Sequence, residues 1–107
     1  MLKGFEQLLS GVGEFKEIIN KIHAELETQR IEASAGAGLV RVAVNGRQEI
    51  IEVHIDQELI KMKDKKLLED LIKSAVNEGM KEAMEVSQKV IKEAIGLDMQ
   101  KSRKVKR

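Results

Sequence analysis

The chain has 107 residues, enough for one domain, with 42% apolar residues, 35% charged residues and no cysteine. The lack of cysteine excludes a disulfide framework, thiolate zinc sites and thiol catalysis, and it agrees with a reducing cytoplasm. The formal net charge of +1 hides an asymmetry, because residues 1–100 carry 14 basic and 18 acidic residues whereas residues 101–107 carry five basic and no acidic ones. No window reaches the ~20 apolar residues of a membrane span, so we expect a cytoplasmic protein without membrane contact.

The N-terminal segment has an apolar stripe that is typical of a helix packed against another helix. Its members follow one another in steps of three and four residues: Phe5, Leu8, Val12, Phe15, Ile19, Ile22 and Leu26. This spacing predicts a helix over about residues 5–28. Gly11 and Gly13 weaken its first half, since a glycine in a helix interior costs about 1 kcal/mol relative to alanine. Ser10 is a candidate N-cap for the firmer part that follows.

Three short strands are predicted next, over about residues 30–35, 38–45 and 48–55. Apolar residues alternate along the last two strands: Val40, Val42 and Val44 share one face, as do Ile51, Val53 and Ile55. Asn45-Gly46 lies between these runs and is a strong hairpin signal, for which we expect a type I′ turn with positive φ at both residues. The strands should form an antiparallel meander whose apolar face is covered by a helix.

Two aspartates mark the starts of helices, because a carboxylate accepts the unpaired amide hydrogens of a first turn. Asp56 should cap a short turn, and Asp64 a long helix over about residues 64–95 that stops near Gly96. Such a helix would be ~46 Å long, whereas a compact domain of this size has a radius of gyration near ~13 Å. The overhanging apolar seams predict a homodimer; a monomer with its helix broken near Gly79 is the alternative.

No group of residues points to catalysis. His23 and His54 are the only histidines, and neither has a second histidine at metal-ligand spacing. Gly11-Val12-Gly13 and Gly36-Ala37-Gly38 lack the Gly-Lys-Ser/Thr of a phosphate-binding loop, so they are interpreted as helix-start and turn glycines. The carboxylates recur among lysines, as on a solvated helix surface. We therefore expect no catalytic residue, no metal, no cofactor and no small-molecule substrate.

Five sequence blocks carry a family resemblance: Ser34–Val42, Val44–Gly46, Val53–Asp56, Leu68–Ile72 and Ala75–Asn77. In order and spacing they resemble the YbaB/EbfC family of bacterial nucleoid-associated DNA-binding proteins, over nearly the whole chain. The resemblance implies an α+β fold with an α-β-β-β-α protomer, a three-stranded antiparallel meander flanked by long helices, and an intertwined, tweezer-like homodimer. It also implies a protein of the cytoplasm and nucleoid that binds duplex DNA, compacts it and affects gene expression.

We assign residues 1–100 to a single domain and residues 101–107 to a basic, flexible tail. Many members of the family end in a tail rich in Met, Gly or Pro, whereas this chain ends in Lys and Arg. The prediction that this tail contacts DNA therefore rests on its charge and not on the resemblance. The predicted DNA-binding residues are Lys89, Lys92, Lys101, Arg103, Lys104, Lys106 and Arg107. Phe5 and Phe15 are the only aromatic residues, so we expect contact with duplex backbone and not the base stacking of RNA or single-strand readers.

The predicted dimer interface combines the helical seam with the apolar face of the strands. It consists of Phe15, Ile19, Leu39, Val40, Val42, Val44, Ile51 and Val53. The seam allows a second function, in which the dimer is an adaptor that holds a helix of a partner protein and binds no DNA. That groove would be formed by Phe5, Leu8, Val12 and Phe15.

Overall fold

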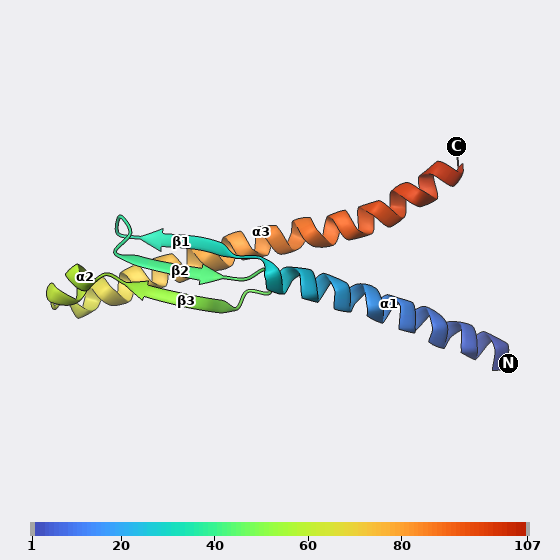
Figure 1. The fold of residues 1–107 in the computed structure, drawn as a ribbon, viewed down its shortest axis with the longest axis horizontal. Coiled ribbons are helices and arrows are strands. Elements are labelled where there is room, and N and C mark those ends of the chain that lie inside the picture. The colour runs from blue at the N-terminus through green and yellow to red at the C-terminus, as the bar shows by residue number, and fades with distance from the viewer. Residues whose placement is uncertain (1, 107) are drawn as a thin grey trace.

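The computed structural model describes the backbone of residues 2–106 and the side chains of residues 12–96. In chain order the elements are α1 (Leu2–Thr28), β1 (Ile31–Ala35), β2 (Val40–Val44), β3 (Ile50–Ile55), α2 (Gln57–Lys61) and α3 (Lys65–Lys106). The predicted α+β class and the α-β-β-β-α order are confirmed, with α2 as a short addition. The radius of gyration is 20.8 Å, well above the ~13 Å of a compact domain. Figure 1 shows why: α1 and the distal half of α3 leave the sheet as two diverging arms.

α1 is one continuous helix from Leu2, so the interpretation of Ser10 as an N-cap is wrong. Three glycines, Gly4, Gly11 and Gly13, lower the stability of this segment without ending the helix, and the sequence has no proline to break it. The helix ends where the Thr28 hydroxyl donates to the Glu25 carbonyl at 2.7 Å and the Gln29 amide donates to the Leu26 carbonyl at 3.2 Å.

The three strands form an antiparallel sheet in the order β1-β2-β3. Ile31 pairs with Val44 across β1 and β2, and Val40 pairs with Ile55 across β2 and β3. Directly opposite residues share a face of the sheet, so the apolar residues of all three strands gather on one side. α3 packs across this side at β1 and β2. Because α3 covers this side of the sheet, the side chains of Val40, Val42 and Val44 are at most 2% exposed.

The connection between β2 and β3 is a hairpin, but the predicted type I′ turn is wrong. The Asn45 amide donates to the Glu49 carbonyl at 3.0 Å, which closes a three-residue loop. Positive φ falls on Gln48, at 62°, and on neither Asn45 nor Gly46. A left-handed residue at the end of a three-residue loop is the usual alternative to the two-residue turn. The Asn45 side-chain oxygen accepts from the amides of Arg47 and Glu49 at 2.9 and 3.1 Å, which fixes the loop.

Both predicted helix caps are present. Oδ1 of Asp56 accepts from the Glu58 amide at 2.9 Å at the start of α2. Oδ1 of Asp64 accepts from the Leu67 amide at 3.0 Å at the start of α3. These two caps place a tight corner between the sheet and the long helix.

α3 runs unbroken past Gly79, which rules out the monomer with a broken helix. Gly79 is buried against β2, and a Cβ there would lie 3.3 Å from Cγ2 of Val42, so this glycine permits close packing of helix on sheet. The predicted stop at Gly96 is also wrong. A glycine ends a helix where it takes the left-handed conformation itself, whereas Gly96 continues α3. Residues 101–106, expected as a separate flexible tail, continue α3 instead. Arg107 lies outside the described residues.

Two hydrophobic clusters hold the protomer together. The larger joins the sheet to α2 and α3 and contains Ala33, Val40, Val42, Leu59 and Ala75. The smaller joins α1 to α3 and contains Ile22, Leu26 and Val90. Among residues 12–96, whose side chains are described, this smaller cluster joins the two arms close to the sheet.

Candidate nucleic-acid interface

A groove between the two arms is apolar. It measures about 350 Å³ and is lined on the helices chiefly by Phe15, Ile18, Ile19, Ile22, Ile91 and Ile95. Beyond the smaller cluster, large side chains stay uncovered: Val12 is 60% exposed, Phe15 64% and Ile95 52%. Apolar surface of this extent is typical of a protein–protein contact rather than of a DNA contact.

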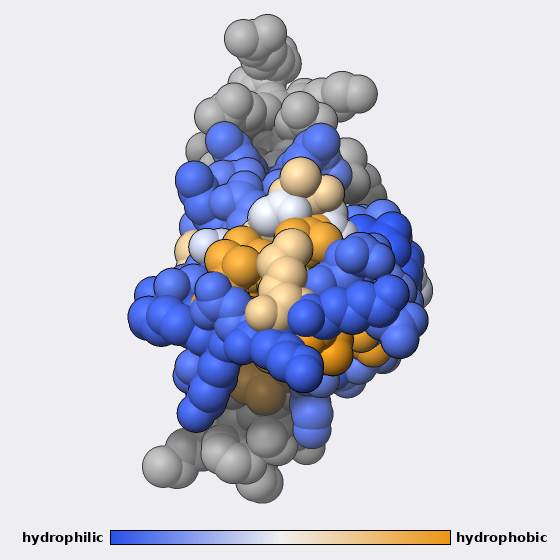
Figure 2. Space-filling view, turned by 90° about the vertical axis from the view of Figure 1, so that its left-hand side faces the viewer, coloured by the Kyte–Doolittle hydropathy of each residue, from blue (hydrophilic) through white to orange (hydrophobic). Residues whose placement is uncertain are grey.

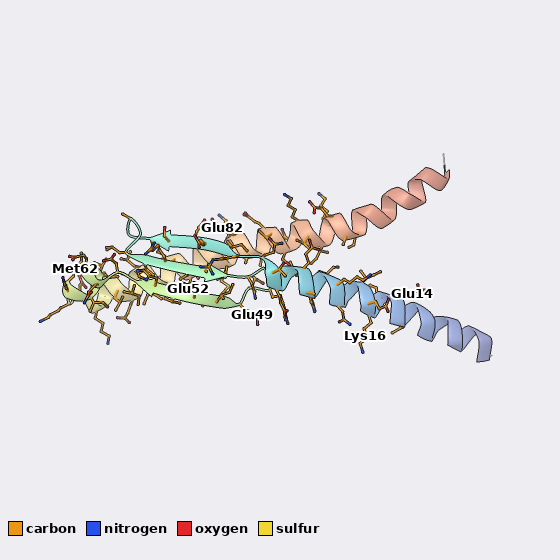
Figure 3. All side chains as sticks on the ribbon, in the orientation of Figure 1. Glu14, Lys16, Glu49, Glu52, Met62 and Glu82 are labelled. Atoms are coloured by element: carbon orange, nitrogen blue, oxygen red, sulfur yellow. The ribbon has the colours of Figure 1, made fainter. Side chains whose placement is uncertain are left out.

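The described part of the arms carries no excess of positive charge. Residues 12–28 contain two lysines and four glutamates, and residues 81–96 contain three of each. Lys89 and Lys92 are both exposed on α3, on either side of the buried Val90. Figure 3 shows the mixture on α1, where Glu14 and Lys16 project from the same turn of the arm. The described part of the arms therefore supplies no net positive charge that would attract a polyanion.

The other predicted DNA-binding residues lie past the described side chains. Residues 101–106 belong to α3, so the helix carries this basic segment at the end of its arm. The side chains of Lys101, Arg103, Lys104 and Lys106, and the whole of Arg107, lie outside the described part of the chain.

The structure divides the predicted dimer interface into covered and accessible residues. Val40, Val42 and Val44 are buried in the protomer's own core, and their contact with a second copy stays a prediction. They are buried because α3 crosses β1 and β2 and leaves β3 uncovered. Ile51 and Val53 on β3 are accordingly 51% and 48% exposed. Phe15 is exposed as well, and Ile19 and Leu39 are half-buried.

The face of the sheet opposite α3 carries a polar depression of about 290 Å³ that the sequence did not reveal. Arg30 donates to Glu52 at 2.8 Å and to Glu32 at 3.2 Å. The hydrogen bond from Arg30 lowers the pKa of Glu52, which Figure 3 places on β3. Arg41 and His54 also line the depression. Two arginines face two carboxylates here, so this surface is compensated in charge and does not favour a polyanion.

The sequence analysis missed a basic cluster at the junction of α2 and α3. Four lysines, Lys61, Lys63, Lys65 and Lys66, stand among residues 60–66 against one aspartate. Averaging charge over residues 1–100 concealed this cluster, although the run of lysines was visible in the sequence. All four lysines are exposed, and the junction lies at the end of the molecule opposite the arms.

Within the part of the chain whose side chains are described, no group of three or more His, Asp and Glu residues could hold a metal ion. No helix in that part is apolar over enough residues to cross a membrane.

An elongated α-β-β-β-α protomer with projecting arms and clustered surface charge defines a small binding protein. Residues 2–98 match the model of the YbaB/EbfC DNA-binding family. The chain belongs to this family, as its sequence blocks predicted. Because this is a family of DNA-binding proteins and not of enzymes, the prediction that the chain is not an enzyme is confirmed.

Curated relatives agree with this assignment. A protein of Syntrophobacter fumaroxidans, named nucleoid-associated protein, is 37% identical over 100 residues, which cover 92% of this chain and 90% of the relative. A protein of Alkaliphilus metalliredigens with the same name is 36% identical over 89 residues, which cover 83% of this chain and 78% of the relative.

A solved structure shares the fold. The uncharacterized protein HP0035 from Helicobacter pylori superimposes with a TM-score of 0.73 over 85% of this chain and 96% of its own. The sequence identity is 24%, so this likeness supports the architecture alone.

Proposed function

We propose that this protein is a nucleoid-associated protein that binds duplex DNA as a homodimer, mainly through contacts of lysine and arginine with phosphates. It acts in nucleoid organisation and gene regulation, and its location is the nucleoid within the cytoplasm. The observation that carries the proposal is the match of residues 2–98 to a DNA-binding family, together with relatives named nucleoid-associated proteins.

Uncovered apolar surface supports the homodimer. Phe15, Ile51 and Val53 are each about half exposed or more, although they are residues that proteins usually bury. β3 is an edge strand with one free side, and exposed edges of this kind pair readily with another chain. A second copy that covers the arms and β3 would remove both features from water.

The charge distribution supports binding through the DNA backbone. Residues 101–107 carry five positive charges. Residues 101–106 form the end of α3, the helix on which Lys89 and Lys92 also lie. Neutralising one phosphate contributes about −0.9 to the slope of log affinity against log salt concentration. With only two phenylalanines and no other aromatic residue, the chain has little means of stacking on unpaired bases.

The test is a titration of duplex DNA with the full-length protein at several salt concentrations, with light scattering on the same sample. We expect the mass of a dimer and an affinity that falls steeply with salt and differs little between DNA sequences. A protein without affinity for duplex DNA at low salt would contradict the proposal.

The apolar groove between the arms supports a second candidate function. In an adaptor, the groove of about 350 Å³ would receive an amphipathic helix of another protein. A stable dimer that fails to bind DNA at low salt would favour the adaptor. Loss of a partner protein on Phe15→Glu, in a variant that remains folded, would then locate the contact in this groove.

A further inference from the structure

The junction of α2 and α3, residues 57–66, forms the end of the molecule opposite the arms. We call it the α2–α3 corner. Leu59 anchors it in the larger core cluster with 1% of its surface exposed. Asp56 and Asp64 cap the helices on either side. Between them, the Lys63 amide donates to the Ile60 carbonyl at 3.2 Å, and Lys63 turns the chain with φ of 50°.

Two large apolar side chains project from the corner. Ile60 and Met62 are each 52% exposed, and all the other residues of the segment 60–66 are charged. Figure 3 shows Met62 at the tip of the molecule. Figure 2 looks onto this end and shows hydrophobic surface at its centre with hydrophilic side chains around it. The corner is therefore an apolar tip inside a polar ring.

The ring is basic. Lys61 and Lys66 have weak acidic neighbours, with Nζ at 3.6 Å from Glu58 and at 3.1 Å from Asp70, and all four of these side chains are 47–81% exposed. Among the described residues, no ion pair includes Lys63 or Lys65. α3 starts at Lys65 with no acidic residue in its first turn, and the carboxylate of Asp64 caps its amide end. The positive character of the corner therefore comes from its lysines.

We infer that the α2–α3 corner is a second contact with duplex DNA, in which its lysines bind phosphates on both sides of the minor groove while Ile60 and Met62 enter the groove and bend the duplex. This inference rests on the proposed function, since it assumes that the protein binds duplex DNA. Proteins that bend DNA from the minor groove insert side chains such as Ile and Met between base steps. The minor groove is about 6 Å wide, so side chains that enter it lie between the phosphates of the two strands.

The charge of the corner selects this partner over a second copy of the chain. Two corners that met would bring together eight lysines and four acidic residues, namely two copies each of Glu58 and Asp64, so the net charge of each corner would repel the other. A phosphate backbone instead supplies the missing negative charge on both sides of the apolar tip. The partner that fits the corner is thus duplex DNA, a polyanion whose minor groove is narrow.

The lysines are tested by the salt dependence of DNA affinity. Lys63→Gln combined with Lys65→Gln should reduce the slope of log affinity against log salt by about 1.8 per bound protomer, because two phosphate contacts are lost. Lys73→Gln combined with Lys81→Gln is the matched control, because it removes two exposed charges from α3 at positions away from the corner. The control should leave the slope unchanged.

The apolar tip is tested by DNA bending, measured as energy transfer between the ends of a duplex of about 30 base pairs. Ile60→Ser combined with Met62→Ser should return the duplex to the end-to-end distance of free DNA and leave the salt slope unchanged. Met84→Ser is the control, because Met84 is 51% exposed at another place on α3. Circular dichroism and light scattering confirm that each variant keeps its fold and its mass.

Three outcomes would overturn the inference and leave the proposed function intact. In the first, the corner variants bind and bend DNA as the wild type does. In the second, Ile60→Ser with Met62→Ser changes the mass of the protein, which would assign the corner to subunit contact. In the third, the lysine variant loses binding to phosphatidylglycerol vesicles but keeps its DNA salt slope, which would assign the corner to lipid. A wild-type protein that fails to bind duplex DNA would instead overturn the proposed function itself.

Discussion

At the residue scale, Gly46 joins the β2–β3 hairpin to the end of α1. Its amide donates to the Leu26 carbonyl at 2.9 Å. A Cβ at this position would lie 2.9 Å from Cδ2 of Leu26 and 3.0 Å from its carbonyl oxygen. Turn chemistry predicted a glycine in the Asn-Gly pair. The structure requires glycine at position 46 because Leu26 of α1 lies too close for a Cβ, and not because the backbone has positive φ there. Only the position of α1, which no local pattern encodes, reveals that reason.

Gly46→Ala should lower the free energy of unfolding by about 1–3 kcal/mol, because the added methyl group forces α1 and the hairpin apart. Denaturant unfolding followed by circular dichroism measures this change. Gly13→Ala is the control, since a Cβ there meets no atom within 4 Å and should stabilise α1 by about 0.5–1 kcal/mol. Equal denaturation midpoints for Gly46→Ala and the wild type would contradict the close approach.

The ion pair of Arg30 and Glu52 gives a prediction about pH. The hydrogen bond from Arg30 holds the pKa of Glu52 below its ordinary value of 4.5. Because the carboxyl binds its proton less readily in the folded state, the stabilisation is complete above pH 4.5 and is lost as the pH falls through the lower folded-state pKa. The contribution is small, since the pair is exposed.

Arg30→Gln should therefore return the pKa of Glu52 toward its ordinary value, as measured by NMR titration of the carboxyl carbon. The variant should also lose less stability than the wild type between pH 4.5 and the acid limit of folding. Arg47→Gln removes an arginine that pairs with Glu27 instead, so it serves as the control. A Glu52 titration curve that is the same in Arg30→Gln and in the wild type would contradict the assigned cause.

At the element scale, β2 and β3 show how far the sequence predicts packing. Both strands alternate apolar and polar residues, and their existence, pairing and common apolar face follow from that alternation. The sequence does not show that α3 covers β2 and leaves β3 exposed, because this depends on where a long helix crosses the sheet. Val42 is therefore 2% exposed and its pairing partner Val53 is 48% exposed.

Val53→Asp should reduce the mass of the proposed dimer to that of a monomer, because it places a charge on the uncovered apolar side of β3. Light scattering measures the mass, and circular dichroism reports whether the protomer stays folded. His54→Asp introduces the same charge on the opposite face of the same strand and should remain a dimer. A dimer that persists in Val53→Asp would place the subunit contact elsewhere.

At the scale of the whole molecule, the heptad stripe and the long apolar pattern predicted an elongated protein, and the extents of 69 × 34 × 18 Å agree with this. The sequence was less informative about the ends. A glycine at position 96 suggested a stop, but α3 continues to Lys106, because a glycine lowers the stability of a helix without by itself ending it. The basic cluster of the α2–α3 corner was readable as a run of lysines, but its exposed tip depends on how α2 anchors in the core.

Deletion of residues 101–107 should weaken DNA binding to a similar degree on all sequences. It should also reduce the salt slope by as much as about 4.5 per protomer, if each of the five basic residues neutralises one phosphate. The measurement is the same salt-titrated duplex binding that tests the full-length protein. An unchanged slope in the truncated protein would exclude this segment from the DNA contact.

The α2–α3 corner and the C-terminal end of α3 lie at opposite ends of a molecule 69 Å long. At 3.4 Å per base pair, this length matches about 20 base pairs, or about two turns of B-form DNA. Contacts two full turns apart face the same side of a duplex, so in the proposed complex both ends of one protomer would reach a single DNA segment without wrapping it. Binding at both ends then depends on helical phase, even where it is indifferent to base sequence.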